Sequence, residues 1–343
     1  MVQQSDADEL DAAWRALSES EVAHGWRTIA VFRGLPCTIL AGRRFPGNEE
    51  ALIVRFKSAA LRGPAQLPEG IGFTVSRLEL PGQGSDQSSI ALCRQTDGNR
   101  DLFVAMAVDV IATMRRLSGA DDNVMLRTFI SRIFAWQEFM RRGGPLALSA
   151  EAEAGLFGEL HVLEMLLDAG VTGASAVDCW RGPLDALHDF ECAPGAIEVK
   201  TSVFSSGIFR ARIGSLDQLD TSLVQPLFVA AVQISQCQGG VTLDEKVGGL
   251  EARLTNEAAV SNFHDRLLKA GFITAPLVRY DRRFVPTGTT ILPVTADFPR
   301  LTRENSPRGI TAAQYEIALD LTELSSTTLD VALDQLGLLK TWN

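Results

Sequence analysis

Hydrophobic and polar residues alternate in short runs through the first part of the chain. These strand-like runs, each bounded by glycine, proline or asparagine, cover residues 28–32, 37–41, 51–56, 72–80 and 88–93. A short amphipathic helix is expected before them, at residues 8–17. Apolar residues then recur at three- and four-residue steps over residues 101–117 and 124–141, a spacing typical of helices. We therefore predict an N-terminal β-rich module at residues 1–118 and a helical connector at residues 119–148.

The pattern changes after a break at Gly143-Gly144-Pro145. Ser149 is suited to cap a helix over residues 151–167, which has acidic residues in its first turn. The segments expected after it are strands at 187–192, 196–203 and 207–213, a helix from about Ser215, and a buried strand at 227–234. This order predicts an α/β or α+β core with a mixed sheet between helices at residues 149–240.

The last part of the chain, residues 241–343, is expected to form an α/β extension. It contains a predicted helix at 250–270, a turn-rich region with several arginines, a strand at 315–319 and a final helix at 329–338. Six of the arginines lie between residues 279 and 308, where acidic residues are few. A local basic surface is one interpretation of this run, and a solvated charged face is the commoner one.

Charge and composition limit the classes of function. Hydrophobic residues make up 46% and charged residues 22% of the 343 positions, which indicates a folded protein. The net charge of −10 argues against a free-standing, non-specific DNA-binding protein. The most apolar stretches, residues 102–114 and 227–234, are too short to cross a bilayer, and no secretory signal is recognisable. A cytoplasmic location with reduced cysteines is expected, and no membrane partner.

Three charged residues are candidates for chemistry on one β-hairpin. If Pro194 and Gly195 occupy the centre of the turn, Asp189 lies opposite Lys200, and Glu198 lies diagonally on the same face. A slip of one residue would move Asp189 to the other face. Neighbouring carboxylates repel each other unless a cation lies between them, and such oxygen ligands suit Mg²⁺. Lys200 beside them suits the stabilisation of charge on a phosphate.

A Glu-x-Lys strand is by itself more often a solvated edge with a cross-strand ion pair. The metal-site interpretation gains weight because other features accompany the Glu-x-Lys strand. An upstream helix carrying Glu159, an acid, a turn and aliphatic strand positions follow one another along the chain. Trp180 has two interpretations: stacking on an unpaired base, or filling a domain edge, which is the usual use of a buried aromatic residue.

A family resemblance rests on these same segments. They are residues 155–160 (GLFGEL), 180–183 (WRGP), 188–190 (HDF), 197–201 (IEVKT) and 213–219 (IGSLDQL). Together they resemble a family of little-characterised bacterial proteins, the PD-(D/E)XK motif proteins of the restriction-endonuclease-like superfamily. Residues 297–301, Gly309, Ile310 and Tyr315 resemble the C-terminal features of that family, so the similarity covers most of the chain.

The resemblance implies a restriction-endonuclease-like fold and a role for each motif residue. By motif, Asp189 and Glu198 would be ligands of Mg²⁺, with Mn²⁺ as a substitute, and Lys200 the catalytic lysine. Glu159 would hold a second metal or a metal-bound water. Gln218, expected to begin the next helix, would contact substrate or water. His188 stands where the superfamily name implies proline, and Asp185, close after Pro183, is the alternative to Asp189.

The resemblance also implies an activity and partners. Members of the family look like components of bacterial restriction or anti-phage gene clusters, so the expected activity is Mg²⁺-dependent endonucleolytic cleavage of DNA. Other subunits of a defence system, such as an ATPase, a helicase or a methyltransferase, are expected partners, and a homodimer is left open. The alternative is a recognition or scaffolding subunit that keeps the nuclease fold without cleaving DNA.

Overall fold

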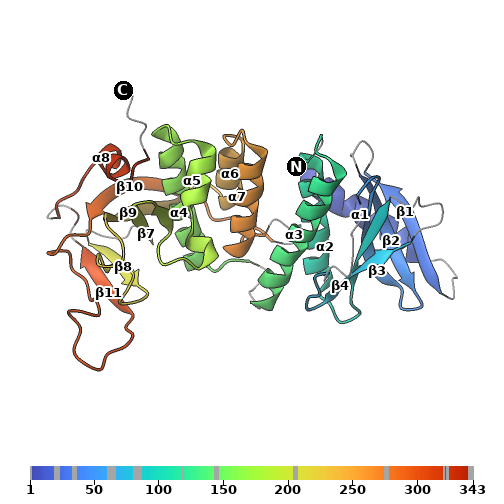
Figure 1. Cartoon of the computed structure of the whole chain (residues 1–343), viewed down its shortest axis with the longest axis horizontal. Coiled ribbons are helices and arrows are strands. Elements are labelled where there is room, and N and C mark those ends of the chain that lie inside the picture. The colour runs from blue at the N-terminus through green and yellow to red at the C-terminus, as the bar shows by residue number, and fades with distance from the viewer. Residues whose placement is uncertain are drawn as a thin grey trace. The chain divides into compact units, whose positions relative to one another are not determined.

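The chain forms two compact units. The computed structural model describes residues 2–18, 24–32, 37–59, 67–79, 87–117, 119–142, 147–203, 208–273, 278–319, 321 and 324–338. The first unit comprises Met1–Ala147 and Gly271–Arg279, and the second comprises Leu148–Ala270 and Tyr280–Asn343 (Figure 1). The predicted break at 143–145 lies outside the described residues. Within the described ranges, no helix has the length and apolar character that crossing a membrane requires.

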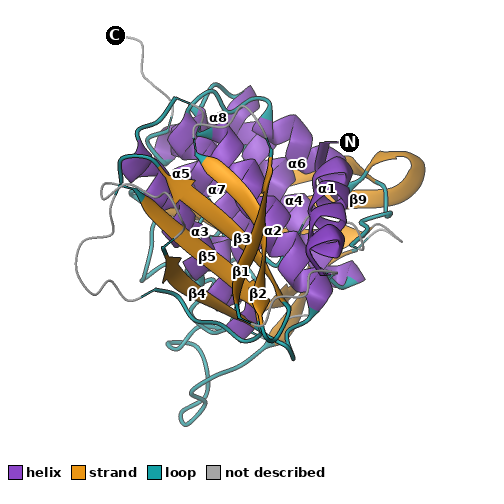
Figure 2. Cartoon of the chain, turned by 90° about the vertical axis from the view of Figure 1, so that its right-hand side faces the viewer, coloured by secondary structure: helices purple, strands orange, loops and turns teal. Residues whose placement is uncertain are grey.

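The first unit is an antiparallel sheet covered by helices. Its five strands are β1 (Gly25–Val31), β2 (Thr38–Phe45), β3 (Glu49–Phe56), β4 (Phe73–Leu78) and β5 (Ser88–Arg94), in the order β1-β2-β3-β5-β4 (Figure 2). Helix α1 (Val2–Ser18) packs against β1, β2 and α2 (Arg100–Arg116), which in turn packs against α3 (Asp122–Arg141). The predicted strands and helices of this region are confirmed, and α3 belongs to this unit.

The second unit is built on a mixed four-stranded sheet. Its strands are β10 (Phe284–Pro293), β9 (Leu227–Val241), β7 (Gly195–Val203) and β6 (Phe190–Cys192), in that order. Strand β7 runs parallel to β9, and the other two pairs are antiparallel. Helix α4 (Ala150–Asp168), capped as predicted by Ser149, packs on β7 and β9. The α+β class with a mixed sheet is therefore confirmed.

Helices collect on one side of this sheet. They are α4, α5 (Gly173–Cys179), α6 (Leu243–Glu251) and α7 (Glu257–Lys269) (Figure 1). The short 3-10 turn η1 (Gly182–Leu184) contacts α7. The single helix predicted at 250–270 is wrong. The chain forms two helices there because Thr242 and Asn256 each cap a new N-terminus through a side-chain oxygen. The final helix, α8 (Leu329–Gln335), lies where it was predicted.

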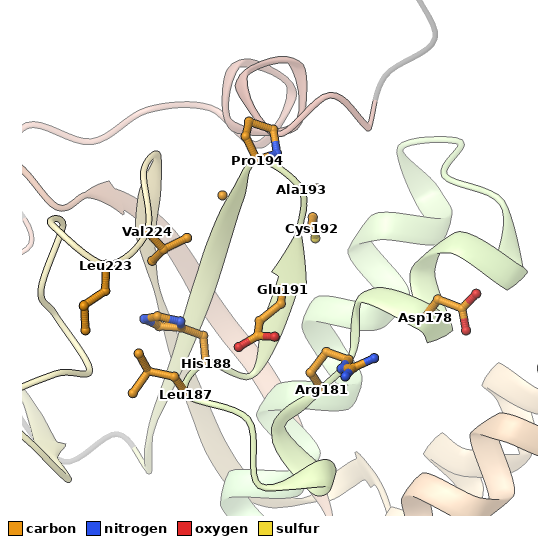
Figure 3. A pocket seen from close by; sticks show the side chains of 11 residues that line it. Asp178, Arg181, Leu187, His188, Glu191, Cys192, Ala193, Pro194, Leu223 and Val224 are labelled. Atoms are coloured by element: carbon orange, nitrogen blue, oxygen red, sulfur yellow. The ribbon is translucent and has the colours of Figure 1, made fainter.

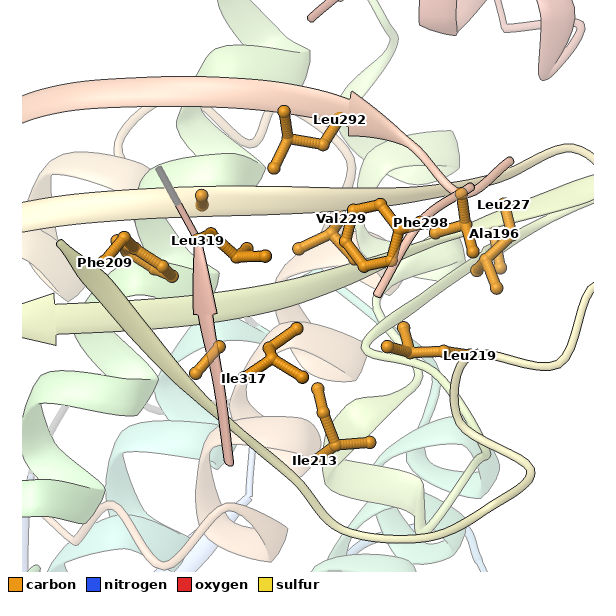
Figure 4. Packing of buried hydrophobic residues seen from close by; sticks show 13 residues of the cluster. Ala196, Phe209, Ile213, Leu219, Leu227, Val229, Leu292, Phe298, Ile317 and Leu319 are labelled. Atoms are coloured by element: carbon orange, nitrogen blue, oxygen red, sulfur yellow. The ribbon is translucent and has the colours of Figure 1, made fainter. Parts of the chain in front are cut away.

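The other side of the sheet is covered by a second, small sheet. Strand β8 (Phe209–Ile213) pairs antiparallel with β11 (Tyr315–Leu319). Apolar side chains of both strands pack with residues of β7, β9 and β10 and with Leu219 and Phe298 in one core cluster (Figure 4). Strand β11 matches its prediction, and residue 207, where β8 was expected to begin, lies outside the described residues.

Two predictions failed near this small sheet. No helix begins near Ser215, because the hydroxyl of Ser215 accepts from the Gln218 backbone and the side chain of Gln218 accepts from Gly214, which closes a turn instead. Strand β10 was read as part of a turn-rich region. It contains Pro286 and lies at an edge of the sheet with a register shift after that proline, and edge strands tolerate such breaks.

Two glycines of α4 make a matched pair for testing how this helix meets the sheet. A Cβ added at Gly158 would lie 1.8 Å from Thr201 Oγ1 and 3.0 Å from Thr201 Cβ, whereas one added at Gly155 would meet nothing within 4 Å. We expect Gly158→Ala to lower the free energy of unfolding by about 1–3 kcal/mol through overpacking. We expect Gly155→Ala to raise it by about 0.5–1 kcal/mol, because alanine is the better helix former. Urea unfolding of both variants measures this, and equal effects would contradict the close approach.

Candidate active site at the edge of the central sheet

The β6–β7 hairpin has a different register from the one predicted. Cys192 pairs with Gly195 and Phe190 with Ile197, so Ala193 and Pro194 alone form the turn. Gly195 is the first residue of β7, and the position requires glycine because a Cβ there would lie 2.1 Å from the carbonyl oxygen of Pro226. The difference from the predicted register is an even number of residues, so Asp189 keeps its predicted face of the hairpin. It comes beside Glu198 rather than opposite Lys200.

The candidate site lies where the pairing of these two strands ends. Strand β6 begins only at Phe190, so beyond Ile197 the strand β7 lacks a backbone partner on that side. The side chain of Asp189 takes over, and its Oδ2 accepts from the backbone N–H of Val199 at 2.7 Å. The carbonyl of Asp189 accepts from the backbone N–H groups of Arg181 and Gly182. Hydrogen bonds therefore hold both the side chain and the backbone of Asp189 in place.

Glu198 and Lys200 project from β7 on the face that also carries Ala196, a member of the core cluster beneath β8 and β11. The Nζ of Lys200 lies 2.7 Å from Glu198 Oε1. The side-chain amide of Gln218 donates to the same oxygen at 2.5 Å. Glu198 is only 1% exposed. Glu198 and Lys200 therefore lie together on one face as predicted, and Gln218, for which a contact with substrate or water was expected, joins them through the Glu198 carboxylate.

Glu159 reaches the same edge from α4. Its Oε2 accepts from Trp180 Nε1 at 2.7 Å, and Trp180 is fully buried. A Cβ added at Gly182 would lie 2.8 Å from Asp189 Oδ1 and 3.3 Å from Glu159 Oε2. Two carboxylates from distant parts of the chain therefore face the same small space beside a glycine.

Three acidic side chains of the site have raised pKa values. Burial, and then the charge of Asp189, raise the pKa of Glu159 to about 8. Burial and the charge of Asp189 also raise the pKa of Glu198 well above its usual value, although Lys200 opposes this. Burial raises the pKa of Asp189 in the same way. One lysine does not compensate three neighbouring carboxylates, so the site favours an added proton or cation.

The residues fit a divalent cation bound through carboxylate oxygens. In the described part of the chain, Glu198 Oε2 is buried and has no hydrogen-bond partner, and the space beside Gly182 is bordered by oxygens of Asp189 and Glu159. Among the described residues, no three His, Cys, Asp or Glu side chains already form a metal cluster. Mg²⁺ commonly takes one or two protein carboxylates and fills its other positions with water and substrate phosphate. Asp189 and Glu198 are suited to be those two.

A cavity of about 440 Å³ adjoins the site along β6 (Figure 3). Its polar wall includes Arg181, His188 and Glu191, and its apolar wall includes Leu187, Leu223 and Val224. His188 is buried, and its Nε2 lies 3.0 Å from the carbonyl oxygen of Gln218. The cavity therefore shares one wall with the loop that carries Gln218.

Comparison with known protein families identifies the chain. Residues 10–320 match the family described as "Putative PD-(D/E)XK family member, (DUF4420)". The chain belongs to this family. No curated protein and no solved structure matches it. The predicted resemblance to the PD-(D/E)XK superfamily is confirmed, and the second unit of this DUF4420 protein has the α+β, nuclease-like fold that the resemblance implied.

Sequence patterns did not identify every residue of the candidate site in this DUF4420 protein. Trp180 was interpreted as filling a domain edge, and its buried ring agrees with that use, yet its indole N–H also orients Glu159. Its position in the WRGP run was the available signal. Asp185, the alternative acid, ends the turn η1 with a left-handed backbone and an exposed side chain. Asp189, not Asp185, lies beside Glu198.

The raised pKa of Glu159 predicts a pH-dependent stability in metal-free buffer. The unfolded carboxyl ionises near 4.5 and the folded one near 8, so the wild type loses stability as pH rises through that window. We expect Glu159→Gln, which keeps an oxygen acceptor for Trp180, to become progressively more stable than the wild type across the window. Calorimetric unfolding with EDTA at pH values inside and outside the window measures the difference. A pH-independent difference would contradict the electrostatic cause.

Proposed function

We propose that this DUF4420 protein is a divalent-metal-dependent nuclease that hydrolyses phosphodiester bonds of DNA in a bacterial restriction or anti-phage system. The observation that carries the chemistry is the meeting of Asp189, Glu198 and Lys200 at the sheet edge, with Glu159 facing the same space as Asp189. The choice of DNA as substrate and of defence as the setting is supported by the family resemblance.

Asp189 and Glu198 would hold the metal, with Glu159 on the adjoining helix. When bound, Mg²⁺ would polarise a phosphoryl oxygen and lower the pKa of a bound water. Lys200, 15% exposed and close to Glu198, is placed to offset charge that develops on the phosphate. Gln218 holds the Glu198 carboxylate through a hydrogen bond, and Trp180 does the same for Glu159. These two residues thus act by positioning the carboxylates.

Cleavage of nucleic acid by the full-length chain tests the proposal. Supercoiled plasmid, single-stranded DNA and RNA are each incubated with the protein and Mg²⁺, Mn²⁺ or EDTA. The expected result is nicking or linearisation of the plasmid with either metal and no reaction with EDTA. Cleavage of RNA alone would overturn the choice of substrate.

The competing function is a recognition or scaffolding subunit with a nuclease fold, which the net charge of −10 favours. Titration calorimetry with Mg²⁺ or Mn²⁺ separates the two. The nuclease proposal expects metal binding that is lost in Asp189→Asn and Glu198→Gln. Absence of both metal binding and cleavage of every substrate would overturn the proposal and favour the scaffold.

A further inference from the structure

Arg300 carries a guanidinium that lacks a partner in the part of the chain that the structure describes. Its Nη1 is buried and makes no hydrogen bond, and no ion pair of this residue occurs among the described residues. Burying part of an arginine without an acceptor costs stability, because the charge loses water without gaining a compensating contact. A half-buried guanidinium whose buried Nη1 lacks an acceptor points to a ligand that supplies one.

The backbone around Arg300 is firmly held. The hydroxyl of Tyr315 accepts from the N–H of Leu301 at 2.9 Å and donates to the carbonyl of the same residue at 3.2 Å. The side-chain amide of Asn305 donates to the carbonyl of Arg300 at 3.0 Å. Phe298, two residues earlier, is anchored in the core cluster between the two sheets (Figure 4). The position of Arg300 therefore follows from a defined local structure.

An ion pair joins the segment that carries Arg300 to the loop that carries Gln218. The guanidinium of Arg303 forms an ion pair with both oxygens of Asp217, at 2.6 and 2.7 Å. Asp217 directly precedes Gln218, which contacts Glu198. The Tyr315 hydroxyl experiences the positive charges of both Arg300 and Lys200, which oppose the rise in its pKa on burial. Both side chains therefore lie within electrostatic range of Tyr315.

The charge of the site explains why a second cation would be needed there. The ammonium of Lys200 is already paired with Glu198, and Asp189 and Glu159 place two further acidic groups at the same edge. A phosphodiester approaching this edge meets three acidic side chains and one lysine that is already paired. A guanidinium presents two parallel N–H donors that match phosphate oxygens, and it remains charged when partly buried.

We propose that Arg300 binds a non-bridging oxygen of a substrate phosphate and so holds the phosphodiester against the edge that carries Glu198 and Lys200. This inference rests on the proposed nuclease function and adds a substrate-binding residue from the β10–β11 connection. It assigns a role to one arginine of the run at 279–308, and it makes the phosphate backbone, not a base, the group that is recognised.

The dependence of DNA binding on salt tests the proposal. The probe is a fluorescein-labelled DNA duplex with Ca²⁺ in place of Mg²⁺, and anisotropy gives the dissociation constant over a series of salt concentrations. We expect Arg300→Gln to bind about ten- to a hundredfold more weakly. Its slope of log K against log salt is expected to be shallower by about 0.9, the value for one lost phosphate contact. Arg300→Lys keeps the charge, so it is expected to keep the slope with weakened binding.

Arg253→Gln is the matched control. It removes the same charge from an exposed arginine that pairs with Asp168 outside the candidate site. Suppose that the wild type binds and cleaves DNA, and that Arg300→Gln and Arg253→Gln have equal dissociation constants and equal salt slopes. That result would overturn the role of Arg300 and leave the nuclease proposal intact. If Arg300→Gln does not fold, wild-type affinity in Arg300→Lys overturns it instead. A wild type that neither binds nor cleaves nucleic acid overturns both proposals.

Discussion

Replacing Lys200 with alanine is expected to slow plasmid cleavage by about a hundred- to a thousandfold, the usual effect of removing one group that stabilises charge in a transition state. The ammonium lies 2.7 Å from Glu198 Oε1, and the lysine projects from the same strand face as Glu198. Metal binding is expected to persist, because carboxylates rather than the amine are the proposed ligands. Rates of plasmid nicking and calorimetric titration with Mg²⁺ measure the two effects separately.

Lys57→Ala serves as the control, because Lys57 is exposed and belongs to the first unit. It removes the same charge and side chain and is expected to cleave at the wild-type rate. If Lys200→Ala cleaves as fast as Lys57→Ala, Lys200 has no part in the reaction. If it loses metal binding together with cleavage, its role is to hold Glu198 in place.

Glu198→Gln is expected to separate stability from activity. The carboxylate is 1% exposed, and burial with the neighbouring charge of Asp189 raises its pKa well above 4.5. The ionised form is therefore destabilising, and the penalty grows as pH rises above 4.5. A neutral amide that still offers an oxygen to Lys200 and Gln218 avoids that penalty. In EDTA, the variant is expected to melt at a higher temperature than the wild type, with the difference increasing with pH.

The same variant is expected to lose at least about a thousandfold in cleavage and to lose the stabilisation that metal provides. For a ligand that binds only the folded state, stabilisation reaches about 2.7 kcal/mol at a hundredfold excess over Kd. The wild type should therefore melt at a higher temperature in Mg²⁺ or Mn²⁺ than in EDTA. Glu191→Gln, an exposed acid on β6, is the control and should keep both the shift and cleavage. Equal metal-induced shifts in both variants would contradict the assignment of Glu198 as a ligand.

Local patterns predicted much of the fold because they report on local geometry. The alternation of the first-unit strands, the cap at Ser149 and the strand at Tyr315–Leu319 follow from side-chain periodicity and capping, which neighbouring residues determine. The same periodicity places Glu198 and Lys200 on one face of β7. An even difference in hairpin register left Asp189 on its predicted face. Strand β10 was missed because its prolines and glycine also describe a turn.

The sequence by itself determined which residues share a strand face, and through the resemblance it pointed to Glu159, Asp189, Glu198, Lys200 and Gln218 as a set. Only the tertiary structure decided how they meet. Strand pairing stops at Phe190, so a side chain of Asp189 completes the edge of β7, and Trp180 turns Glu159 toward the space beside Gly182. The segment of Arg300 is held by Tyr315 of the small sheet and by the ion pair between Arg303 and Asp217. Such contacts depend on packing between distant segments, and no local period encodes them.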